Sequence, residues 1–495
     1  MAFQIQPELL NFVFIPFMAP GHSIPMIDLA KLFAERGVNV TIIVTPLNAA
    51  RFNSVINRAV ESGQSIRLLQ VKFPGEEAGL PPGCESAETL PSYELIPNFF
   101  TAVKMLQQPI EEELRNLIPL PSCVICDKHI PWTAQTCKNL RIPRIIFDGM
   151  SCFAPLVTHV LYVSKVHETV PPNEPFVVPD FPDEIELTRF QLPGLLNPSP
   201  RINFYDFREQ VKKTEEEAYG VVVNSFEELE KDYFEMFRKL KGGKVWCVGP
   251  LSLYGNDDLD RAGRGNKASI DTDRCMKWLD DMKPESVIYA CLGSLSRLSR
   301  SQFVELALGL EASKHSFVLV VKTEGEKSLE IEKWILDNGF EERTKDRGFL
   351  IRGWSPQVLI LSHFAVGGFL THCGWNSTLE GICAGLPMVM WPMFGEQFLN
   401  EKLVVQILGT GVGVGAKSTV HLGDEEMDEM RVTRKGITKA VVAVMDRGTE
   451  GCERRRKAKE LGEMAKRAVQ VGGSSCKNVD QLIQEVAPLS VARDV

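Results

Sequence analysis

Short apolar stretches alternate with amphipathic helical stretches along this chain of 495 residues, and this alternation constrains its fold most strongly. In the first half, the apolar stretches cover residues 11–16, 38–44, 66–71, 123–126 and 142–147. Strands that alternate with helices in this way form parallel sheets covered by helices on both faces. The pattern therefore predicts an α/β fold built from doubly wound sheets.

The alternation stops once and then resumes. Residues 255–273 are rich in Gly, Asp and Arg and have no apolar periodicity, which is typical of an exposed linker. Further strands are expected at 286–292, 317–321, 366–370 and 387–391. The chain is also too long for one ordinary core. We predict four segments: an N-terminal domain (1–253), a linker (254–273), a C-terminal domain (274–471) and a final segment (472–495).

Composition excludes several classes of partner. The net charge of -9 gives no general attraction for nucleic acid or anionic membranes. No run approaches the roughly 20 apolar residues that a membrane span needs. The 12 cysteines follow no repeating framework, and the Cys123-Val-Ile-Cys126 motif lacks the second ligand pair of a zinc site. Free thiols in a reducing compartment, the cytoplasm, are therefore expected.

The most informative stretch for function lies between Trp354 and Gln397. Residues 367–372 resemble a strand that leads into a turn and a helix, and ligands bind beyond the carboxyl ends of such strands. The first turn of a helix offers unpaired N–H groups to an anion. Gly374 lets the backbone approach that anion, and side-chain donors surround it. The sequence therefore predicts a diphosphate site that includes His372, Gly374, Asn376 and Ser377.

Other residues of this stretch suit the rest of a nucleotide-sugar. Glu380 lies one helical turn beyond Asn376, where a carboxylate can accept hydrogen bonds from both ribose hydroxyls. Trp354 offers a ring on which a base can stack, and Gln357 offers an amide nearby. Glu396 and Gln397 follow the next strand and can bind sugar hydroxyls. Each residue alone also fits a purely structural strand, turn and capped helix, but their joint occurrence favours a binding site.

Two other motifs are weaker. The pair in Asp271-Thr-Asp273 could hold a divalent metal, but it immediately precedes a helical stripe and is better explained as a helix cap. The Gly-rich stretch from Gly409 to Gly415 lacks the GxGxxG spacing and predicts a tight loop and strand. We expect no metal, and the missing GxGxxG argues against a nicotinamide-dependent oxidoreductase.

His22 is the strongest candidate for a general base. It follows Gly21 after the first strand, and Ser23 is expected to cap the helix that begins there, with Pro25 in its first turn. An imidazole with a pKa of about 6.5 suits proton abstraction near neutral pH. Asp127 ends another strand of the same predicted sheet and can orient the ring. His129 competes for Asp127, but its two-residue spacing is expected to point it elsewhere.

The stretch from Trp354 to Gln397 resembles the signature of plant family-one glycosyltransferases, which transfer sugars from UDP-sugars to small secondary metabolites. Further similarity is found in Gly21-His22, Phe73-Pro-Gly-Glu-Glu-Ala-Gly-Leu-Pro, Val223-Asn-Ser-Phe-Glu-Glu-Leu-Glu, Trp278-Leu-Asp and Gly293-Ser294. The resemblance implies a GT-B fold, in which two Rossmann-like domains face a central cleft. It places the acceptor in the N-terminal domain, the UDP-sugar in the C-terminal domain, and the final helix against the N-terminal domain.

The resemblance also implies roles for single residues. His22 and Asp127 match the family's catalytic pair, and Gln397 matches a position where glucose users often carry Gln. Glu396 departs from the commoner Asp, which leaves the strictness for glucose open. The remaining positions that match the donor site are Ser294, Trp354, Gln357, His372, Gly374, Trp375, Asn376, Ser377 and Glu380.

We therefore expect an inverting UDP-glucose-dependent O-glucosyltransferase without a cofactor, a cytoplasmic monomer acting on a flavonoid or triterpenoid hydroxyl. Cytokinin or steroid acceptors and other UDP-sugars remain open. So does a catalytically silent protein that only binds nucleotide-sugars, although the presence of both His22 and Asp127 argues against it.

Overall fold

The computed structural model describes residues 10–198, 204–254, 263–266, 272–296, 298–322, 326–420 and 432–491. Asp271 and the side chains of Thr272 and Asp273 lie outside the described residues, as does most of the expected linker. The chain divides into two compact units. Unit 1 consists of residues 1–152, 202–256 and 467–495, and unit 2 of residues 153–201 and 257–466. Residues 153–201, expected in the N-terminal domain, are thus grouped with unit 2.

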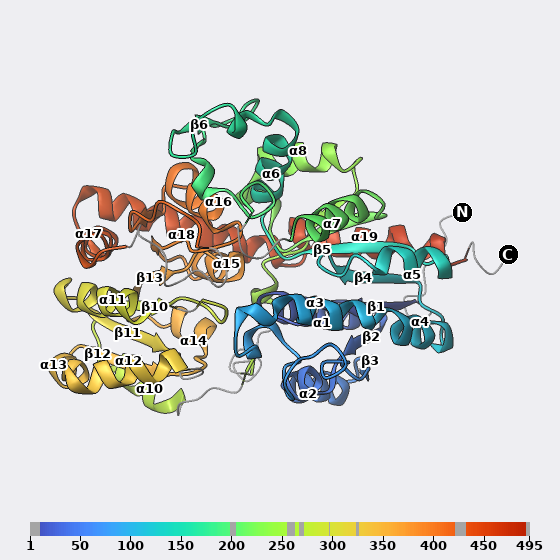
Figure 1. Cartoon of the computed structure of the whole chain (residues 1–495), viewed down its shortest axis with the longest axis horizontal. Coiled ribbons are helices and arrows are strands. Elements are labelled where there is room, and N and C mark those ends of the chain that lie inside the picture. Colours follow the sequence, from blue (N-terminus) through green and yellow to red (C-terminus); the bar gives the residue numbers. More distant parts are fainter. Residues whose placement is uncertain are drawn as a thin grey trace. The chain divides into compact units, whose positions relative to one another are not determined.

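Unit 1 contains a seven-stranded sheet in the order β3-β2-β1-β4-β5-β8-β9, and all its strands are parallel (Figure 1). The strands β1, β2, β4 and β5 are largely buried, whereas most residues of β3 are partly or fully exposed, and all five strands were predicted. The strands β8 and β9 were not predicted as strands. The bounds are β1 Asn11–Ile15, β2 Asn39–Val44, β3 Ile66–Gln70, β4 Cys123–Asp127, β5 Arg144–Asp148, β8 Gly220–Val223 and β9 Val245–Cys247.

Helices connect these parallel strands, as a doubly wound sheet requires. The central strand β1 and the following helix share an aromatic contact, in which Phe33 packs against Phe12 and Phe14 with ring centroids 5.1 and 5.8 Å apart. All three rings are fully buried. The helices of unit 1 are α1 Pro20–Ala34, α2 Pro46–Glu61, α3 Ile96–Met105, α4 Gln107–Asn116, α5 Thr133–Leu140, α7 Tyr205–Glu216, α8 Lys231–Leu240 and α19 Ser474–Val491.

Helix α1 begins earlier than expected. Its first residue is Pro20, and Ala19 occupies the N-cap in an extended conformation. Ser23 therefore does not cap the helix; its hydroxyl donates a hydrogen bond to the Ala19 carbonyl at 3.1 Å. Proline is well suited to the first helical position, because the missing N–H would have no partner there. As a result, His22 lies in the first turn of α1 and not in the loop before it.

Unit 2 contains a six-stranded parallel sheet in the order β12-β11-β10-β13-β14-β15 (Figure 1). The expected strand in the Gly-rich stretch is confirmed as β15, whereas β12 was not predicted. The bounds are β10 Val287–Cys291, β11 Ser316–Val321, β12 Gly348–Arg352, β13 Val366–Thr371, β14 Met388–Met390 and β15 Gly411–Gly413. A small antiparallel pair, β6 Phe176–Val177 and β7 Glu186–Leu187, also belongs to unit 2.

The core of unit 2 includes one buried polar link. Tyr289 on β10 is fully buried and stacks on Phe369 of β13 at 5.4 Å, and its hydroxyl lies 2.6 Å from the Ser355 hydroxyl. This hydrogen bond fastens the loop after β12 to the central strand. The helices of unit 2 are α6 Phe153–Ser164, α10 Thr272–Asp280, α11 Arg300–Ala312, α12 Glu326–Asp337, α13 Phe340–Thr344, α14 Gln357–Leu361, α15 Trp375–Cys383, α16 Gln397–Lys402, α17 Arg434–Met445 and α18 Thr449–Val469.

The last helix, α19, packs against the edge strand β9 of unit 1. The Asn478 amide donates to the Cys247 carbonyl at 2.9 Å and to Glu227 Oε1 at 2.8 Å. The Ser475 hydroxyl, also buried, donates to the Gly249 carbonyl at 2.5 Å. The helix therefore supplies side-chain donors to carbonyls in and just after the edge strand.

Replacing Asn478 with Ala should lower the free energy of unfolding by about 1–3 kcal/mol, because the buried Cys247 carbonyl loses this donor. The matched control is Gln481→Ala on the same helix, where an exposed amide binds exposed Glu485, and a change within about 0.5 kcal/mol is expected. Urea unfolding of both variants measures the difference. Equal shifts for the two variants would contradict the assigned role of Asn478.

Candidate active site

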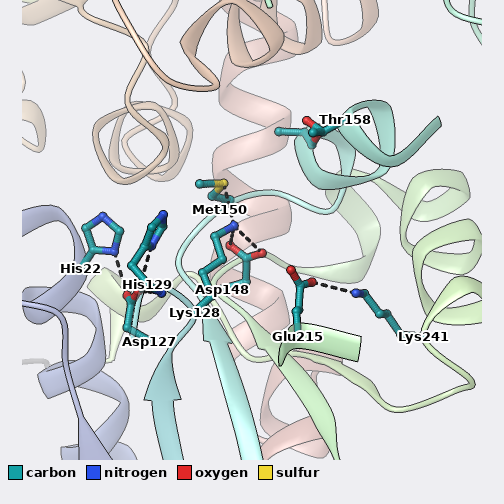
Figure 2. A network of polar contacts seen from close by, with 10 residues as sticks. His22, Asp127, Lys128, His129, Asp148, Met150, Thr158, Glu215 and Lys241 are labelled. Carbon is teal, nitrogen blue, oxygen red and sulfur yellow. Dashed lines mark hydrogen bonds and ion pairs between the residues drawn. The ribbon is translucent and has the colours of Figure 1, made fainter. Parts of the chain in front are cut away.

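The first cluster of candidate residues lies at the carboxyl end of β4 in unit 1. Asp127 is the last residue of this strand, and only 1% of its side chain is exposed. His22 Nδ1 lies 2.7 Å from Asp127 Oδ2 (Figure 2). β1 and β4 are parallel neighbours, so the helix that follows β1 starts beside the end of β4. The expected pairing of His22 with Asp127 is therefore present.

His129 was wrongly expected to point elsewhere. Its ring Nδ1 lies 3.0 Å from Asp127 Oδ1, and its backbone N–H donates to the same oxygen at 2.8 Å. The chain turns back on itself directly after β4, and this turn places both groups on the carboxylate. Figure 2 shows the two imidazoles on one carboxylate, with their ring centroids 5.1 Å apart.

Three donors decide the charge of Asp127. Burial opposes ionisation, but the charge of His22 and the hydrogen bonds from both imidazoles hold the pKa of Asp127 well below its usual range. An ionised carboxylate only accepts hydrogen bonds, so each imidazole directs an Nδ1–H at Asp127. This fixes the tautomer of neutral His22 and leaves its Nε2 lone pair available for a proton.

A second buried ion pair lies beside the first. Lys128 Nζ donates to both oxygens of Asp148, at 3.0 and 2.9 Å, and Asp148 is fully buried. Glu215 pairs with Lys241 at 2.7 Å and adds to the negative field around Lys128 (Figure 2). Burial alone would lower the pKa of Lys128, yet these carboxylates raise it. The cation next in sequence to Asp127 is therefore neutralised by its own partners.

Aromatic rings surround the two histidines. The Phe17 ring lies 5.3 Å from the His22 ring, 5.8 Å from the His129 ring and 5.7 Å from Phe100. Phe100 in turn contacts Phe204 and Phe207, at 5.5 and 4.4 Å. These three last rings are partly exposed. An apolar, partly accessible surface therefore continues from the paired His22.

The second cluster lies in unit 2, beyond the carboxyl ends of β10, β11, β13 and β14. His372 and Gly374 follow β13, and α15 begins at Trp375 with Gly374 as its N-cap. Because Gly374 has no side chain, it supplies no cap to the first N–H groups of the helix, which include those of Asn376 and Ser377. The predicted anion site has the expected local structure.

The His372 ring lies between two glycines. A Cβ atom on Gly293 would lie 2.4 Å from His372 Cε1, and a Cβ atom on Gly374 would lie 2.4 Å from His372 Nε2. Gly374 therefore makes room for this ring, in addition to its expected role of admitting an anion. Gly293 also has a φ of +77°, which favours glycine. Ser294 directly follows it.

The environment of His372 favours the neutral form. Burial, with a smaller contribution from Lys322, lowers the pKa of His372 to about 4. Among the residues that the structure describes, His372 Nδ1 is buried and has no hydrogen-bond partner. Lys322 directly follows β11 and donates to the Ser294 carbonyl, so a cation lies close to the expected diphosphate site. Lys322 was missed from the sequence, although it follows the same rule of residues beyond strand ends.

Several expected ligand groups already contact one another. The Gln357 amide donates to Glu380 Oε2 at 2.7 Å and to the Ser377 hydroxyl at 3.1 Å. Arg264 forms an ion pair with the other oxygen of Glu380. Arg264 comes from the stretch expected to be a linker, and nothing in its sequence pattern indicated this contact. Trp354, which follows β12, is partly exposed, whereas Trp375 is 3% exposed.

The last pair of expected residues follows β14. The side-chain oxygen Oε1 of Gln397 accepts hydrogen bonds from the backbone N–H groups of Met393 and Phe394, at 2.8 and 3.0 Å. Its amide nitrogen is thus the group that it can offer to a ligand. Glu396 accepts from Asn400 at 3.3 Å, and Asn400 also donates to the Cys373 carbonyl at 2.9 Å. This network links the Glu396 loop to the turn before α15.

Comparison with known proteins agrees with this arrangement. Residues 8–253 match the family described as "Glycosyltransferase, N-terminal domain", and residues 282–448 match "UDP-glucoronosyl and UDP-glucosyl transferase". The chain is 49% identical to UDP-glycosyltransferase 73C3 of Arabidopsis thaliana over 489 residues, covering 98% of each. It is 48% identical to UDP-glycosyltransferase 1 of Barbarea vulgaris over 483 residues, covering 97% of each.

Solved structures show the same fold. UGT73P12 of Glycyrrhiza uralensis, complexed with glycyrrhetinic acid 3-O-monoglucuronide, matches with a TM-score of 0.89 and 37% identity over 98% of this chain and 97% of that one. UGT89C1 of Arabidopsis thaliana, complexed with UDP-L-rhamnose, matches with a TM-score of 0.74 and 28% identity over 96% and 99%. The expected GT-B fold of two Rossmann-like domains is thereby confirmed. No helix among the described residues is long and apolar enough to cross a membrane. This chain belongs to the UDP-glycosyltransferases of plants, enzymes that transfer a sugar from a UDP-sugar donor to a small molecule.

Proposed function

We propose that the protein is an inverting UDP-glucose-dependent O-glucosyltransferase that acts on a hydroxyl of a flavonoid or triterpenoid. The contact of 2.7 Å between His22 Nδ1 and Asp127 Oδ2 carries this proposal, because it prepares a general base. A protein that only bound nucleotide-sugars would have no use for this pair. The test incubates the protein with UDP-glucose and a panel of aglycones. UDP release is assayed, and the products are identified by mass spectrometry.

The base works through its second ring nitrogen, Nε2. Asp127 accepts the Nδ1–H of His22, so Nε2 takes the proton from the acceptor hydroxyl as that oxygen attacks the anomeric carbon. His22 then becomes positively charged, and the ionised Asp127 stabilises the imidazolium. Attack in one step, from the side opposite UDP, converts an α-linked donor into a β-glucoside.

Unit 2 contains the groups that suit the leaving UDP. The first N–H groups of α15 and the neutral imidazole of His372 can donate to the diphosphate as its charge grows. The orphaned buried Nδ1 of His372 gains a partner if an anion binds there. Asn376, Ser377, Ser294 and Lys322 add donors around the same strand ends. Glu380 and Gln357 suit the ribose, and Trp354 suits the base.

The acceptor class rests on the aromatic surface and on two relatives. The partly exposed rings of Phe100, Phe204 and Phe207 suit a flat or fused-ring apolar molecule. UGT73P12 is complexed with a triterpenoid glucuronide, and UGT89C1, 28% identical, is complexed with quercetin in one structure. The same assay also tests cytokinin and steroid acceptors, and it tests UDP-sugars other than UDP-glucose as donors.

We also infer a cytoplasmic monomer. All twelve cysteines are free thiols, and the Sγ atoms of Cys152 and Cys247 lie 3.7 Å apart without a bond. A reducing compartment keeps such a pair in this state. Each of the two clusters is also complete within a single chain.

His22→Ala should reduce turnover by about 10²–10⁴-fold, the usual contribution of a general base, and should leave UDP binding nearly unchanged. Asp127→Asn should reduce turnover less than His22→Ala does, because the ring of His22 stays in place and only the stabilisation of its positive charge weakens. Steady-state rates on a flavonol and on a triterpenoid, with UDP affinity by calorimetry, measure both effects. Near wild-type rates for His22→Ala would refute the assignment of the base.

Gly293→Ala should weaken UDP binding by about 10–100-fold, because the added Cβ displaces His372 and removes a hydrogen bond to a charged ligand. Gly415→Ala is the matched control. It has a φ of +89° and therefore similar backbone strain, but no atom of the described residues lies within 4 Å of its added Cβ. Calorimetry with UDP compares the two variants, and equal loss in both would mean that His372 does not contact the diphosphate.

Gln397→Glu tests the sugar contact. The carboxylate keeps an acceptor for Met393 and Phe394 but removes the amide donor. The KM for UDP-glucose should rise by about 3–10-fold, the loss of one neutral hydrogen bond, while inhibition by UDP should stay the same. If the affinity for UDP falls as much as that for UDP-glucose, Gln397 does not bind the sugar.

A further inference from the structure

Three potential metal ligands surround the carboxylate of Asp127. The ligand atoms of His22, Asp127 and His129 all lie within 4.8 Å of one another. Each imidazole contacts a different oxygen of the carboxylate: His22 Nδ1 lies 2.7 Å from Asp127 Oδ2, and His129 Nδ1 lies 3.0 Å from Asp127 Oδ1. The proposed mechanism uses one of these imidazoles and gives no role to the other.

We propose that His22, Asp127 and His129 form a binding site for a divalent transition metal such as Zn²⁺, and that the bound ion inhibits the enzyme. Two imidazole nitrogens, one carboxylate oxygen and one open position form a common zinc ligand set. Ligand atoms that share a tetrahedral zinc lie about 3.4 Å apart, given bond lengths near 2.1 Å. Because the two rings contact different carboxylate oxygens, both rings would shift to admit one ion between them.

The site is both held and accessible. Asp127 ends β4 and its side chain is 1% exposed, and the backbone N–H of residue 129 holds one of its oxygens. The side chains of His22 and His129 are each 28% exposed, so an ion can reach them from solvent. The nearest cation in sequence, Lys128, is paired with Asp148 at 2.9 Å, and its charge also acts on Asp127 and His129.

The ligand types select among metals. Imidazole nitrogen favours Zn²⁺, Cu²⁺, Ni²⁺ and Co²⁺, whereas Mg²⁺ prefers oxygen ligands and keeps its water. Mg²⁺ should therefore bind poorly here. The inference does not concern donor binding, which needs no ion in the proposed mechanism.

We expect inhibition because a bound metal changes the tautomer of His22. This expectation rests on the proposed function, in which His22 is the base. A metal at Nδ1 takes the lone pair of that nitrogen, so the proton of the neutral ring resides on Nε2. The base needs the lone pair on Nε2 to accept the proton of the acceptor. The ion also replaces the hydrogen bond between His22 and Asp127. A ring that binds the metal therefore cannot act as the base.

Metal binding is tested on the full-length protein after treatment with EDTA, by Zn²⁺ calorimetry and by the visible absorption of bound Co²⁺. The test variant is His129→Asn, which removes one ligand and keeps the backbone N–H bond to Asp127. We expect its Zn²⁺ affinity to fall at least tenfold. His315→Asn in unit 2 controls for histidine loss, and Cys452→Ser controls for the exposed thiol. Unchanged affinity in His129→Asn, or loss of the site in Cys452→Ser, would overturn the proposal.

Turnover then tests inhibition. Zn²⁺ should inhibit the wild type reversibly, with recovery on adding EDTA, and Mg²⁺ should not inhibit at equal concentration. The concentration for half-inhibition should rise at least tenfold in His129→Asn, with each variant compared with its own metal-free rate. Zn²⁺ that binds the wild type without slowing it would overturn the inhibitory role. If no acceptor is turned over, the proposed function fails, while calorimetry still decides the metal site.

Discussion

The buried carboxylate of Asp127 is the charge around which the end of the first sheet is arranged. An isolated carboxylate in an apolar interior costs several kcal/mol, so it persists only with donors in place. Two imidazoles and one backbone N–H supply them, from the first turn of α1 and from the turn after β4. The same contacts orient His22 and fix its tautomer. The same carboxylate therefore serves both the local fold and the proposed chemistry.

In the second sheet, the candidate histidine is positioned by steric fit and not by a charged partner. His372 fits beside the backbone only because Gly293 and Gly374 lack side chains, and its burial keeps the ring neutral. A neutral imidazole can donate to an anion without first being stabilised by a counterion. The hydroxyl of Ser355, bonded to Tyr289 in the core, steadies the loop that carries Trp354 and Gln357. Core packing thus extends to the residues expected to bind the nucleotide.

Much of the fold and of the site was predictable, because parallel strands deliver their following residues to one edge of a sheet. That rule paired His22 with Asp127 across about a hundred residues, and it placed His372 near Glu396. The features that the sequence did not predict depend on contacts that leave no periodic pattern in the sequence. The early start of α1, the return of His129 to Asp127 and the ion pair of Arg264 with Glu380 each arise from irregular backbone. The strands β8 and β9 have only four and three residues, and β12 has only three apolar residues between Gly348 and Arg352, so none gives a clear pattern.

If Glu380 binds the ribose as proposed, its ion pair with Arg264 makes nucleotide binding an exchange reaction. A ribose that uses Glu380 replaces contacts that this carboxylate already makes, so its net affinity is the difference between two sets of hydrogen bonds. A ligand with both vicinal hydroxyls can compensate for the displaced guanidinium, whereas one that lacks a hydroxyl leaves the carboxylate underbonded. The ion pair therefore lowers the overall affinity for the nucleotide. It also increases the difference in affinity between ribonucleotides and deoxyribonucleotides.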